Sequence, residues 1–411
     1  MTTFSDILLN LRRQSKSKPA TLPKNECTTY RGSVCTICPL IQSNYNDELR
    51  IKNEAIREFW RMHRLDGKPE SIIASPLSRR YRTNSKRRAF ITDNRVLLGL
   101  TGMDDEGKIK PLDVRQCGIE PLLHSRIYAY VQQWLSSEAS YMFARALNYV
   151  ILRGDDRRIT ILLSVRDEDN RIKRDCTLLS KSLSREFPMV VGFLLIRDEY
   201  SKYYMSDKAV SDPTALQKIF GERDVVQDVG EQQFSHSVLG FSQTNPSVLP
   251  DFIAMVHDLI SPQPHHTLYD LYCGYGLFGL SLAPNVEKVI GVEMSRHSVD
   301  SARTNALRMK IANARFHIGD LSGLTLEPIL KKQKTPFIAV LDPPRSGTAP
   351  GVIETLAMAK PDRVVHVFCD IERLPYELKR WRQSGYRAAH VIPVDMFPAT
   401  GNVEVAVLLE T

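Results

Sequence analysis

From residue 241 onward, short apolar runs alternate with segments whose apolar residues recur at helical spacing. The apolar runs predict buried strands, which we expect at residues 268–272, 288–293, 314–318, 337–341 and 364–368. The intervening segments predict helices over 277–284, 296–309, 326–332, 350–359 and 371–384. Such alternation is typical of a parallel, doubly wound sheet with helices on both faces. Two closing apolar runs, 388–394 and 403–409, predict an antiparallel edge.

The pattern before residue 241 is less regular and predicts an α+β arrangement. Apolar residues with helical spacing predict a helix over 47–63, and we expect another helix over 125–145 and strands over 159–165, 190–196 and 203–205. The chain is therefore expected to be an α/β protein in four parts. These are a basic disordered arm (1–26), a cysteine-containing module (27–124), a central α+β domain (125–240) and a C-terminal α/β domain (241–411).

Composition and charge indicate a globular protein with an acidic partner. The chain has 411 residues, is 43% apolar and carries a net charge of +8. This charge favours nucleic acid as the partner, although it also serves solubility alone. The apolar run 190–196 is too short to span a bilayer, and the polar N-terminus lacks the apolar core of a secretory signal. We therefore expect a cytoplasmic protein without a membrane partner and without disulfides.

A glycine-rich turn follows the first of the predicted parallel strands. Gly274, Gly276 and Gly279 have the spacing of a nucleotide-binding turn, although ordinary turns of α/β folds share it. Glu293 ends the next strand, nineteen residues after Gly274, where a carboxylate binds the ribose of NAD or of S-adenosylmethionine. Asp270, inside the first strand, suits a cofactor with a cationic amino-acid end better than a pyrophosphate. It therefore favours S-adenosylmethionine.

Two later strand ends carry further candidate chemistry. Asp342-Pro-Pro-Arg345 follows the fourth predicted strand, and Cys369 follows the fifth. The carboxyl ends of strands line the ligand crevice of an open α/β sheet, so we expect Cys369 beside the cofactor. A thiolate there is a good nucleophile. A cysteine considered alone is more simply buried and inert.

The N-terminal cysteines have the spacing of a metal centre. Cys27-x7-Cys35-x2-Cys38 gives three thiols on turn-rich sequence, and Cys117 is a candidate fourth ligand. Three clustered cysteines and one remote cysteine suit a four-iron, four-sulfur cluster. Zinc and reduced structural cysteines remain the alternatives.

The segment 79–88 holds six cations together with Tyr81. This combination suits phosphate contact and base stacking in RNA. If the segment is a strand, alternation places Arg80, Arg82, Lys86 and Arg88 on one face. A solvated basic strand is the alternative interpretation.

Taken together and in this order, the motifs resemble those of the RNA uracil-C5 methyltransferases, most closely the group acting on 23S ribosomal RNA. The resemblance covers nearly the whole chain after the first twenty-odd residues. It implies a Rossmann-like methyltransferase domain over 241–411 and an iron–sulfur and RNA-contact module over 27–124. The motifs are Cys27-x7-Cys35-x2-Cys38 with Cys117, Tyr81-Arg82, Phe241-Ser-Gln243-Thr-Asn245-Pro, Asp270-Leu-Tyr-Cys-Gly-Tyr-Gly, Gly291-Val-Glu293, Asp342-Pro-Pro-Arg345, Cys369, and Asp395-Met-Phe-Pro398 with Glu404.

The resemblance implies an S-adenosylmethionine-dependent reaction at C5 of a uridine. Cys369 would attack C6 of the uracil, and Glu404 would remove the C5 proton after methyl transfer. The uracil must leave its stack to reach such a site. Phe241 could assist, although a packed aromatic is the simpler reading.

The same resemblance implies the ligands and partners. Binding of S-adenosylmethionine would fall to Gln243, Tyr272, Glu293 and Asp342, and a 4Fe–4S cluster would be held by Cys27, Cys35, Cys38 and Cys117. RNA, with 23S ribosomal RNA first and transfer RNA second, is the expected partner of a monomer.

Three residues depart from the family pattern. Asp370 stands where the family has asparagine, and Asn402 and Ala399 stand where histidine is common. A carboxylate beside the nucleophile should raise the pKa of its thiol. These departures leave open a non-catalytic RNA-binding protein of the same fold. The glycine spacing alone would also fit an NAD-linked dehydrogenase.

Overall fold

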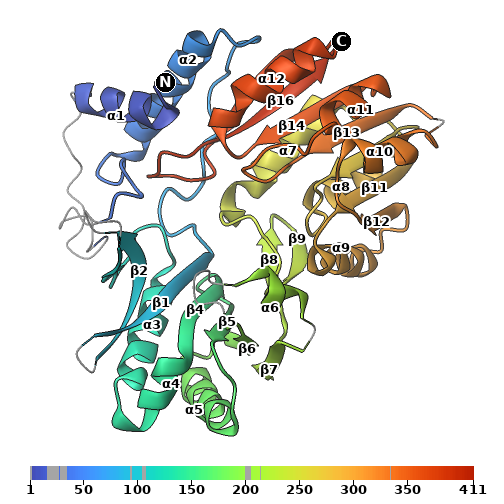
Figure 1. Cartoon of the computed structure of the whole chain (residues 1–411). Helices are drawn as coiled ribbons and strands as arrows, with labels where there is room; N and C mark the ends of the chain where they lie inside the picture. Colours follow the sequence, from blue (N-terminus) through green and yellow to red (C-terminus); the bar gives the residue numbers. More distant parts are fainter. Residues whose placement is uncertain are drawn as a thin grey trace.

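The computed structural model describes residues 2–15, 27, 35–92, 95–103, 108–199, 205–212, 214–333 and 335–411. Two seven-stranded sheets organise these residues, and a two-stranded ribbon, β8 (Asp224–Val229) with β9 (Gln232–Ser237), lies between them (Figure 1). Among the described helices, none is both long and apolar enough to cross a membrane.

The C-terminal sheet has the strand order β12-β11-β10-β13-β14-β16-β15. Its first five strands are parallel, whereas β16 and β15 are antiparallel additions at one edge. The predicted strands agree with the observed ones to within one residue at each end. The strands are β10 (Thr267–Leu271), β11 (Lys288–Glu293), β12 (Ala314–Ile318), β13 (Phe337–Leu341), β14 (Arg363–Phe368), β15 (Arg387–Val394) and β16 (Glu404–Glu410).

Helices cover both faces of this sheet, as the alternation predicted. Successive residues of β10 belong to opposite cores: Leu268 packs in the cluster with Phe278, and Tyr269 in the cluster with Trp381. Burial on both faces explains why the strands read as continuous apolar runs. The helices are η3 (Pro246–Val248), α7 (Leu249–Ile260), α8 (Leu277–Leu282), η4 (Ala283–Asn285), α9 (Arg296–Arg308), α10 (Gly323–Leu330), α11 (Val352–Met358), η5 (Ile371–Arg373) and α12 (Leu374–Gln383).

The other sheet has the order β3-β2-β1-β4-β5-β6-β7 and crosses the boundary that we expected at residue 125. In β1 three consecutive cations precede the apolar residues, and β2 contains two glycines, so neither segment has the sequence pattern of a buried strand. Among the described strands of this sheet, β5 and β6 form the only parallel pair, and α5 connects them. The elements are β1 (Asn84–Thr92), β2 (Arg95–Met103), β3 (Ile109–Leu112), β4 (Leu147–Gly154), β5 (Ile159–Val165), α5 (Asn170–Glu186), β6 (Val190–Arg197), α6 (Asp207–Ser211) and β7 (Leu216–Gly221).

The single helix expected over 125–145 is wrong. The chain forms α3 (Leu122–Leu135), then η2 (Glu138–Ser140) and α4 (Tyr141–Ala146). Serines end the first helix, since the Ser140 hydroxyl donates to the Trp134 carbonyl at 2.7 Å and competes with the helical pattern. The short strand expected at 203–205 falls mostly outside the described residues.

The N-terminal arm is helical rather than disordered over α1 (Phe4–Gln14). Thr3 and Asp6 form a capping box, and the buried Phe4 meets Phe59 of α2 (Tyr45–His63) edge to face, with ring centroids 6.0 Å apart. The basic composition of the segment hid this amphipathic pattern. The rest of the predicted arm, residues 16–26, lies outside the described part of the chain.

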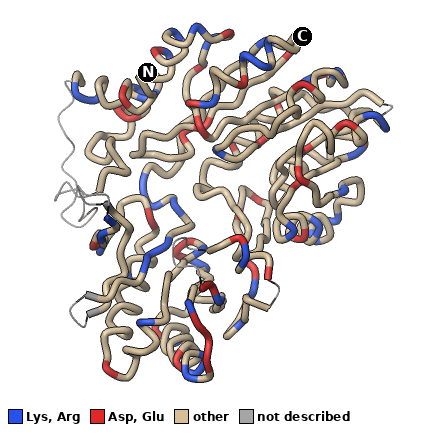
Figure 2. Tube along the Cα trace, viewed as in Figure 1, with Lys and Arg blue, Asp and Glu red and all other residues tan. Residues whose placement is uncertain are grey.

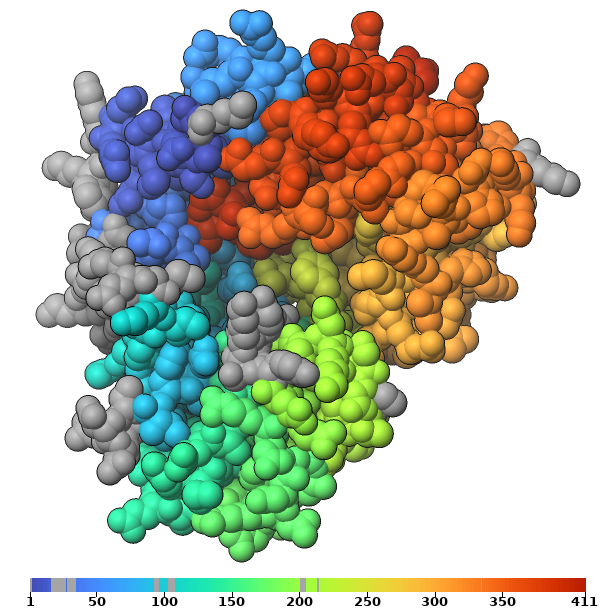
Figure 3. All heavy atoms as spheres, in the orientation of Figure 1, coloured from blue at the N-terminus to red at the C-terminus, as the bar shows by residue number. Residues whose placement is uncertain are grey.

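The N-terminal segment is joined to the C-terminal sheet. After α2 the chain runs along β15 and forms parallel bridges at Pro69–Val391 and Ile73–Val394. These bridges cover part of an edge strand. N-terminal residues (blue) therefore lie directly against C-terminal ones (red) on the molecular surface (Figure 3).

Candidate active site

A cavity of about 670 Å³ opens at the carboxyl ends of the parallel strands of the C-terminal sheet. The strand order reverses between β10 and β13, which is where open α/β sheets bind ligands. We call this cavity the strand-end pocket. Every residue predicted from the sequence to be catalytic or to bind the cofactor lines it: Gln243, Tyr272, Glu293, Asp342, Cys369 and Glu404.

The glycine turn forms one wall of the strand-end pocket. Tyr272, at its start, adopts a positive φ of 63°, which is rare outside glycine. Gly279 is required by a close approach, because its N–H donates to Asp270 Oδ2 at 2.8 Å and an added Cβ would lie 2.7 Å from that oxygen. Asp270 thus stabilises the turn through its hydrogen bond to Gly279, but it does not line the pocket. Burial raises the pKa of its carboxyl to about 7.

Glu293 links the second strand to the glycine turn. Its Oε2 accepts from the Gly274 N–H at 3.2 Å, and its Oε1 accepts from the Ser295 N–H at 2.8 Å. The next residue, Met294, is 70% exposed and lines the pocket together with Asp320. Met294 was not singled out from the sequence. An apolar side chain directly after the acidic strand end was the available signal.

Asp342 and Gln243 meet across the pocket. Gln243 Nε2 donates to Asp342 Oδ2 at 3.2 Å. Burial, followed by the charge of Asp270, raises the pKa of the Asp342 carboxyl. The pairing brings a loop from outside the sheet to the end of β13.

Cys369 and Glu404 line the same pocket from neighbouring strands. Antiparallel pairing of Phe368 with Val405 sets the end of β14 beside the start of β16. The Cys369 thiol donates to the Pro343 carbonyl at 3.7 Å. Glu404 is fully buried, and its Oε2 has no hydrogen-bond partner among the described residues. The arrangement offers a thiol and a carboxylate oxygen able to take a proton.

Burial raises the pKa of both side chains. Burial raises the pKa of the Cys369 thiol to about 12, with further contributions from Glu404 and Asp342. Asp370 acts in the direction expected from the sequence, but it is the smallest of the contributions. Burial and Asp342 likewise raise the pKa of Glu404, whereas Arg345 lowers the pKa of both groups.

The pocket lining is strongly acidic. It includes the carboxylates of Glu293, Asp320, Asp342 and Glu404, and Arg345 is the one lysine or arginine among the lining residues. Four carboxylates with a single cation favour a positively charged ligand.

Phe241 lies at the same pocket and is 64% exposed. The simpler sequence reading, a packed aromatic, is therefore wrong. An exposed aromatic ring beside a cavity is available for stacking.

The basic segment 79–88 divides between the interior and the surface. Arg79 pairs with Glu48, and Arg87 is buried against Glu120 at 2.6 Å. Lys86 and Arg88 lie on the opposite, more exposed face of β1, as the alternation predicted. Arg80 and Arg82 lie before the strand begins, so the prediction does not hold for them. Lysine and arginine positions (blue) lie along the chain where it passes between the two sheets (Figure 2).

The four N-terminal cysteines lie near one another. Cys27, Cys38 and Cys117 pack against one small apolar cluster that contains Tyr81. Cys35 and Cys27 both act on the Cys38 thiol and raise its pKa. Even so, no group of three or more potential ligands in the described residues is arranged to hold a metal ion. The predicted cluster is thus not confirmed.

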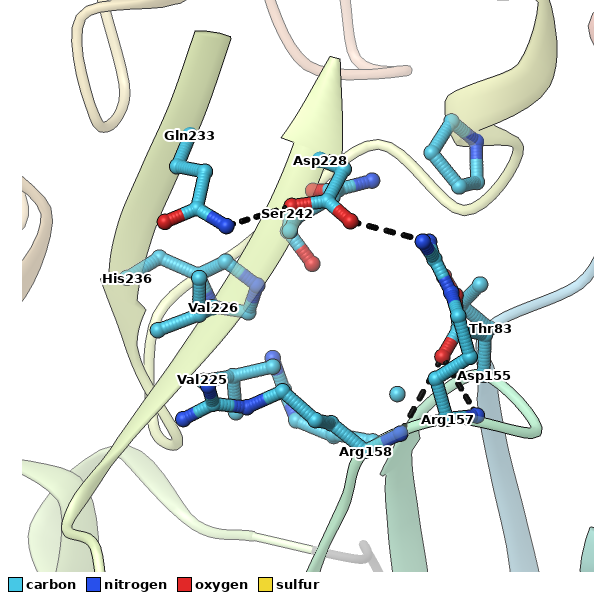
Figure 4. A pocket seen from close by; sticks show the side chains of 14 residues that line it. Thr83, Asp155, Arg157, Arg158, Val225, Val226, Asp228, Gln233, His236 and Ser242 are labelled. Carbon is cyan, nitrogen blue, oxygen red and sulfur yellow. Dashed lines mark hydrogen bonds and ion pairs between the residues drawn. The ribbon is translucent and has the colours of Figure 1, made fainter. Parts of the chain in front are cut away.

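A second cavity, of about 190 Å³, lies beside the ribbon β8–β9. Arg157 lines this cavity and pairs with Asp155 at 2.8 Å and Asp228 at 2.9 Å (Figure 4). The charged groups of Arg157, Asp155 and Asp228 are therefore paired with one another rather than directed at a ligand.

Polar residues of this second cavity hold the chain that enters the strand-end pocket. Arg153 Nη1 donates to the Gly240 carbonyl at 2.7 Å, and Gln227 Nε2 donates to the Gln243 carbonyl at 3.0 Å. The central part of the protein, where the sequence indicated no chemistry, thereby positions the segment that carries Phe241 and Gln243.

The fold and site define the class of protein. The solved structure of Pyrococcus abyssi tRNA (uracil-54, C5)-methyltransferase in complex with S-adenosyl-L-homocysteine matches with a TM-score of 0.67 at 18% identity. The match covers 90% of this chain and 85% of that one. This protein therefore has the α/β fold of the methyltransferases.

Sequence comparison then gives the family. The family model described as tRNA (uracil-5-)-methyltransferase matches residues 214–411. Uncharacterised RNA methyltransferases of Halalkalibacterium halodurans (25% identity, 97% of this chain, 85% of that protein) and Geobacter sulfurreducens (27%, 92%, 76%) align over most of both chains. A relative from Caldanaerobacter subterraneus is 29% identical, and the match spans 57% of its length. The match to the family model assigns residues 214–411 to the family of RNA uracil-C5 methyltransferases.

Proposed function

We propose that this protein transfers the methyl group of S-adenosylmethionine to C5 of a uridine in 23S ribosomal RNA. The observation that carries the proposal is the placement of a thiol, Cys369, and a carboxyl group, Glu404, in one pocket, where they would serve as nucleophile and base. The protein would act as a monomer in the cytoplasm.

The acidic lining supports S-adenosylmethionine rather than NAD as the ligand. The sulfonium and ammonium groups of S-adenosylmethionine are cationic, whereas the pyrophosphate of NAD would face Glu293, Asp320, Asp342 and Glu404. Glu293 and Tyr272 would hold the nucleoside and amino-acid parts, together with Gln243 and Asp342. The bound cofactor supplies an electrophilic methyl group. Thermal-shift binding of S-adenosylhomocysteine but not NADH is expected, and the opposite result would favour a dehydrogenase.

The two protein groups act in sequence. The Cys369 thiolate forms a bond to C6 of the uracil, and the C5=C6 electron pair moves into an enolate. C5 then takes the methyl group, and the electron pair of the broken carbon–sulfur bond leaves with the cofactor sulfur. Glu404 removes the C5 proton, the double bond re-forms, and the thiolate leaves. The partnerless Glu404 Oε2 is suited to this last step.

The RNA would approach along the basic face of β1. Lys86 and Arg88 are suited to phosphate contact there. The exposed Phe241 is suited to stack on a base that has left the helix. These contacts require an RNA with an accessible, unstacked uridine.

5-Fluorouridine RNA tests the mechanism. Fluorine replaces the C5 proton, so Glu404 has no proton to remove and the adduct with Cys369 persists. We expect a band stable in denaturing gels with wild type and no band with Cys369→Ala. If wild type forms no adduct, or if Cys369→Ala forms one, the mechanism is wrong. An enzyme that binds RNA and cofactor but gives no single-turnover methylation would instead be a non-catalytic RNA-binding protein.

Transfer RNA is the second candidate substrate. The matching family description and the P. abyssi structure both name tRNA. Methylation of purified ribosomal and transfer RNA pools by the same preparation separates the two. Incorporation confined to transfer RNA would replace the first proposal.

We propose further that Cys27, Cys35, Cys38 and Cys117 hold a 4Fe–4S cluster that stabilises the N-terminal module. Support comes from the packing of three of these thiols against one apolar cluster. An anaerobic preparation should be brown and contain about four irons per chain. A colourless protein with one zinc would contradict the cluster.

A further inference from the structure

The loop between β15 and β16 carries the proposed base. Val394, at the end of β15, pairs with Glu404, the first residue of β16, so residues 395–403 close a hairpin directly at the strand-end pocket. Ala399 in this loop is fully buried and has a φ of 68°. A non-glycine residue in that conformation persists only where its surroundings hold it. The loop must therefore be held from outside.

Lys52, on α2, holds the loop from more than 340 residues away in the sequence. Its Nζ donates to Asp395 Oδ1 at 2.6 Å, to the Phe397 carbonyl at 2.9 Å and to the Asn402 carbonyl at 3.1 Å. All three protons of the ammonium group thus have acceptors. The side chains of Lys52 and Asp395 are both 0% exposed.

The same face of α2 contributes two more contacts. One turn before Lys52, Glu48 accepts from the Ala399 N–H at 2.7 Å. Tyr45 donates to Asp395 Oδ2 at 3.0 Å. Residues three, four and seven apart share one helix face, so Tyr45, Glu48 and Lys52 form a single stripe. We call this stripe the α2 clamp.

Asn402 connects the α2 clamp to Arg345, the cationic residue of the strand-end pocket. While Lys52 holds the Asn402 carbonyl, the side-chain Oδ1 of Asn402 accepts from Arg345 Nη2 at 3.3 Å. Arg345 lines the strand-end pocket with Cys369 and Glu404. The departure from the family histidine at position 402 therefore occupies a defined place between the clamp and the pocket.

A buried ion pair is a poor way to gain stability. Desolvation offsets most of the attraction, and apolar replacements are often neutral. Such pairs are better suited to fixing one arrangement of the chain. The clamp fixes the two ends and the strained middle of one loop, which is what a base at the end of that loop requires.

We propose that Lys52 and Glu48 are positioning residues for the proton-abstraction step, because they fix the loop that carries Glu404. The proposal rests on the proposed function above. It assigns the N-terminal helix a part in the last chemical step, in addition to any part in RNA binding.

The order of the steps provides a specific measurement, the amount of covalent enzyme–RNA complex, which a loss of stability alone would not increase. Attack by Cys369 and methyl transfer precede proton removal, so a misplaced base should leave methylated RNA bound covalently to the enzyme. With ordinary uridine RNA, Lys52→Met should accumulate a complex stable in denaturing gels, as Glu404→Gln should, and wild type should not. We expect product release to slow by about tenfold or more, since a positioned base contributes on the order of 10² to 10⁴.

Two controls separate folding from positioning. Arg87→Met breaks a comparably buried ion pair, with Glu120, in the other sheet, and should lower stability without accumulating the complex. The double variant Lys52→Met/Asp395→Asn leaves no unpaired charge. If Lys52→Met does not fold, the double variant, folded by circular dichroism, supplies the test.

The outcomes are distinguishable. Trapping of 5-fluorouridine RNA by wild type and by the clamp variant, with accumulation on ordinary RNA only in the variant, supports the proposal. A folded clamp variant that releases product at the wild-type rate, or that loses adduct formation together with cofactor binding, overturns it. Failure of wild type to trap 5-fluorouridine RNA would instead overturn the proposed function.

Discussion

At the scale of single residues, the surroundings of Cys369 oppose its proposed role as the nucleophile. A thiol must ionise to attack, yet burial and three carboxyl groups raise the pKa of Cys369 to about 12. Arg345 opposes this increase, because its positive charge lowers the pKa of both Cys369 and Glu404. A cationic cofactor would act in the same direction.

Replacing Arg345 with methionine should slow single-turnover methylation. Loss of the positive charge raises the pKa of the Cys369 thiol further, and each unit reduces the thiolate about tenfold at a fixed pH. Since the thiol pKa already lies above the working range, the rate should rise with pH in wild type and variant alike. Rates measured from about pH 7 to 9.5, at saturating RNA and cofactor, check this expectation.

Asp370→Asn is the matched control. Asp370 makes the smallest contribution to the raised thiol pKa, so its neutralisation should change the rate by less than about threefold. Equal effects of the two substitutions would contradict the assigned electrostatics.

At the scale of elements, the sequence predicted what local patterns encode. Five strands of the C-terminal sheet, β10, β11, β13, β14 and β16, are buried on both faces, so their sequences are nearly continuous apolar runs. The helix α1 was missed because Arg12, Arg13 and the lysines after them obscured the apolar stripe of Phe4, Ile7 and Leu8. No local pattern encodes the α2 clamp, since Lys52 and Asp395 meet only in the folded chain.

Gly279→Ala should weaken the glycine turn and, with it, cofactor binding. The added Cβ would lie 2.7 Å from Asp270 Oδ2, so the hydrogen bond between the Gly279 N–H and that carboxylate must lengthen. Loss of a buried hydrogen bond costs about 1–3 kcal/mol, so thermal unfolding should shift down and S-adenosylhomocysteine should bind about tenfold more weakly by calorimetry.

A glycine with free space around it controls for backbone flexibility. An added Cβ at Gly385, in a turn far along the chain, meets no atom within 4 Å, although its φ of 90° also disfavours alanine. Gly385→Ala should therefore cost stability through strain while cofactor affinity stays unchanged. Equal loss of affinity in both variants would argue against a specific role of the Asp270 contact.

At the scale of the whole molecule, separate parts of the chain converge on one pocket. The central sheet holds the segment with Phe241 and Gln243 through Arg153 and Gln227, and α2 holds the loop before Glu404. The sequence identified the members of the pocket by their motifs. It did not identify the residues that hold them, because those residues carry no motif and lie hundreds of positions away.

RNA binding should depend mainly on the positive charges along β1. If Lys86 and Arg88 contact phosphates, replacing both with alanine removes two counterion-releasing contacts. The slope of log K against log salt for a single-stranded or loop RNA should fall by about 1.4, at about 0.7 per contact. Filter binding between about 50 and 200 mM salt measures the slope.

Replacing the exposed Lys332 and Lys379 with alanine lowers the net charge by the same amount and should leave the slope unchanged. An equal change in both variants would mean that RNA responds to overall charge rather than to this face, and the approach along β1 would have to be abandoned.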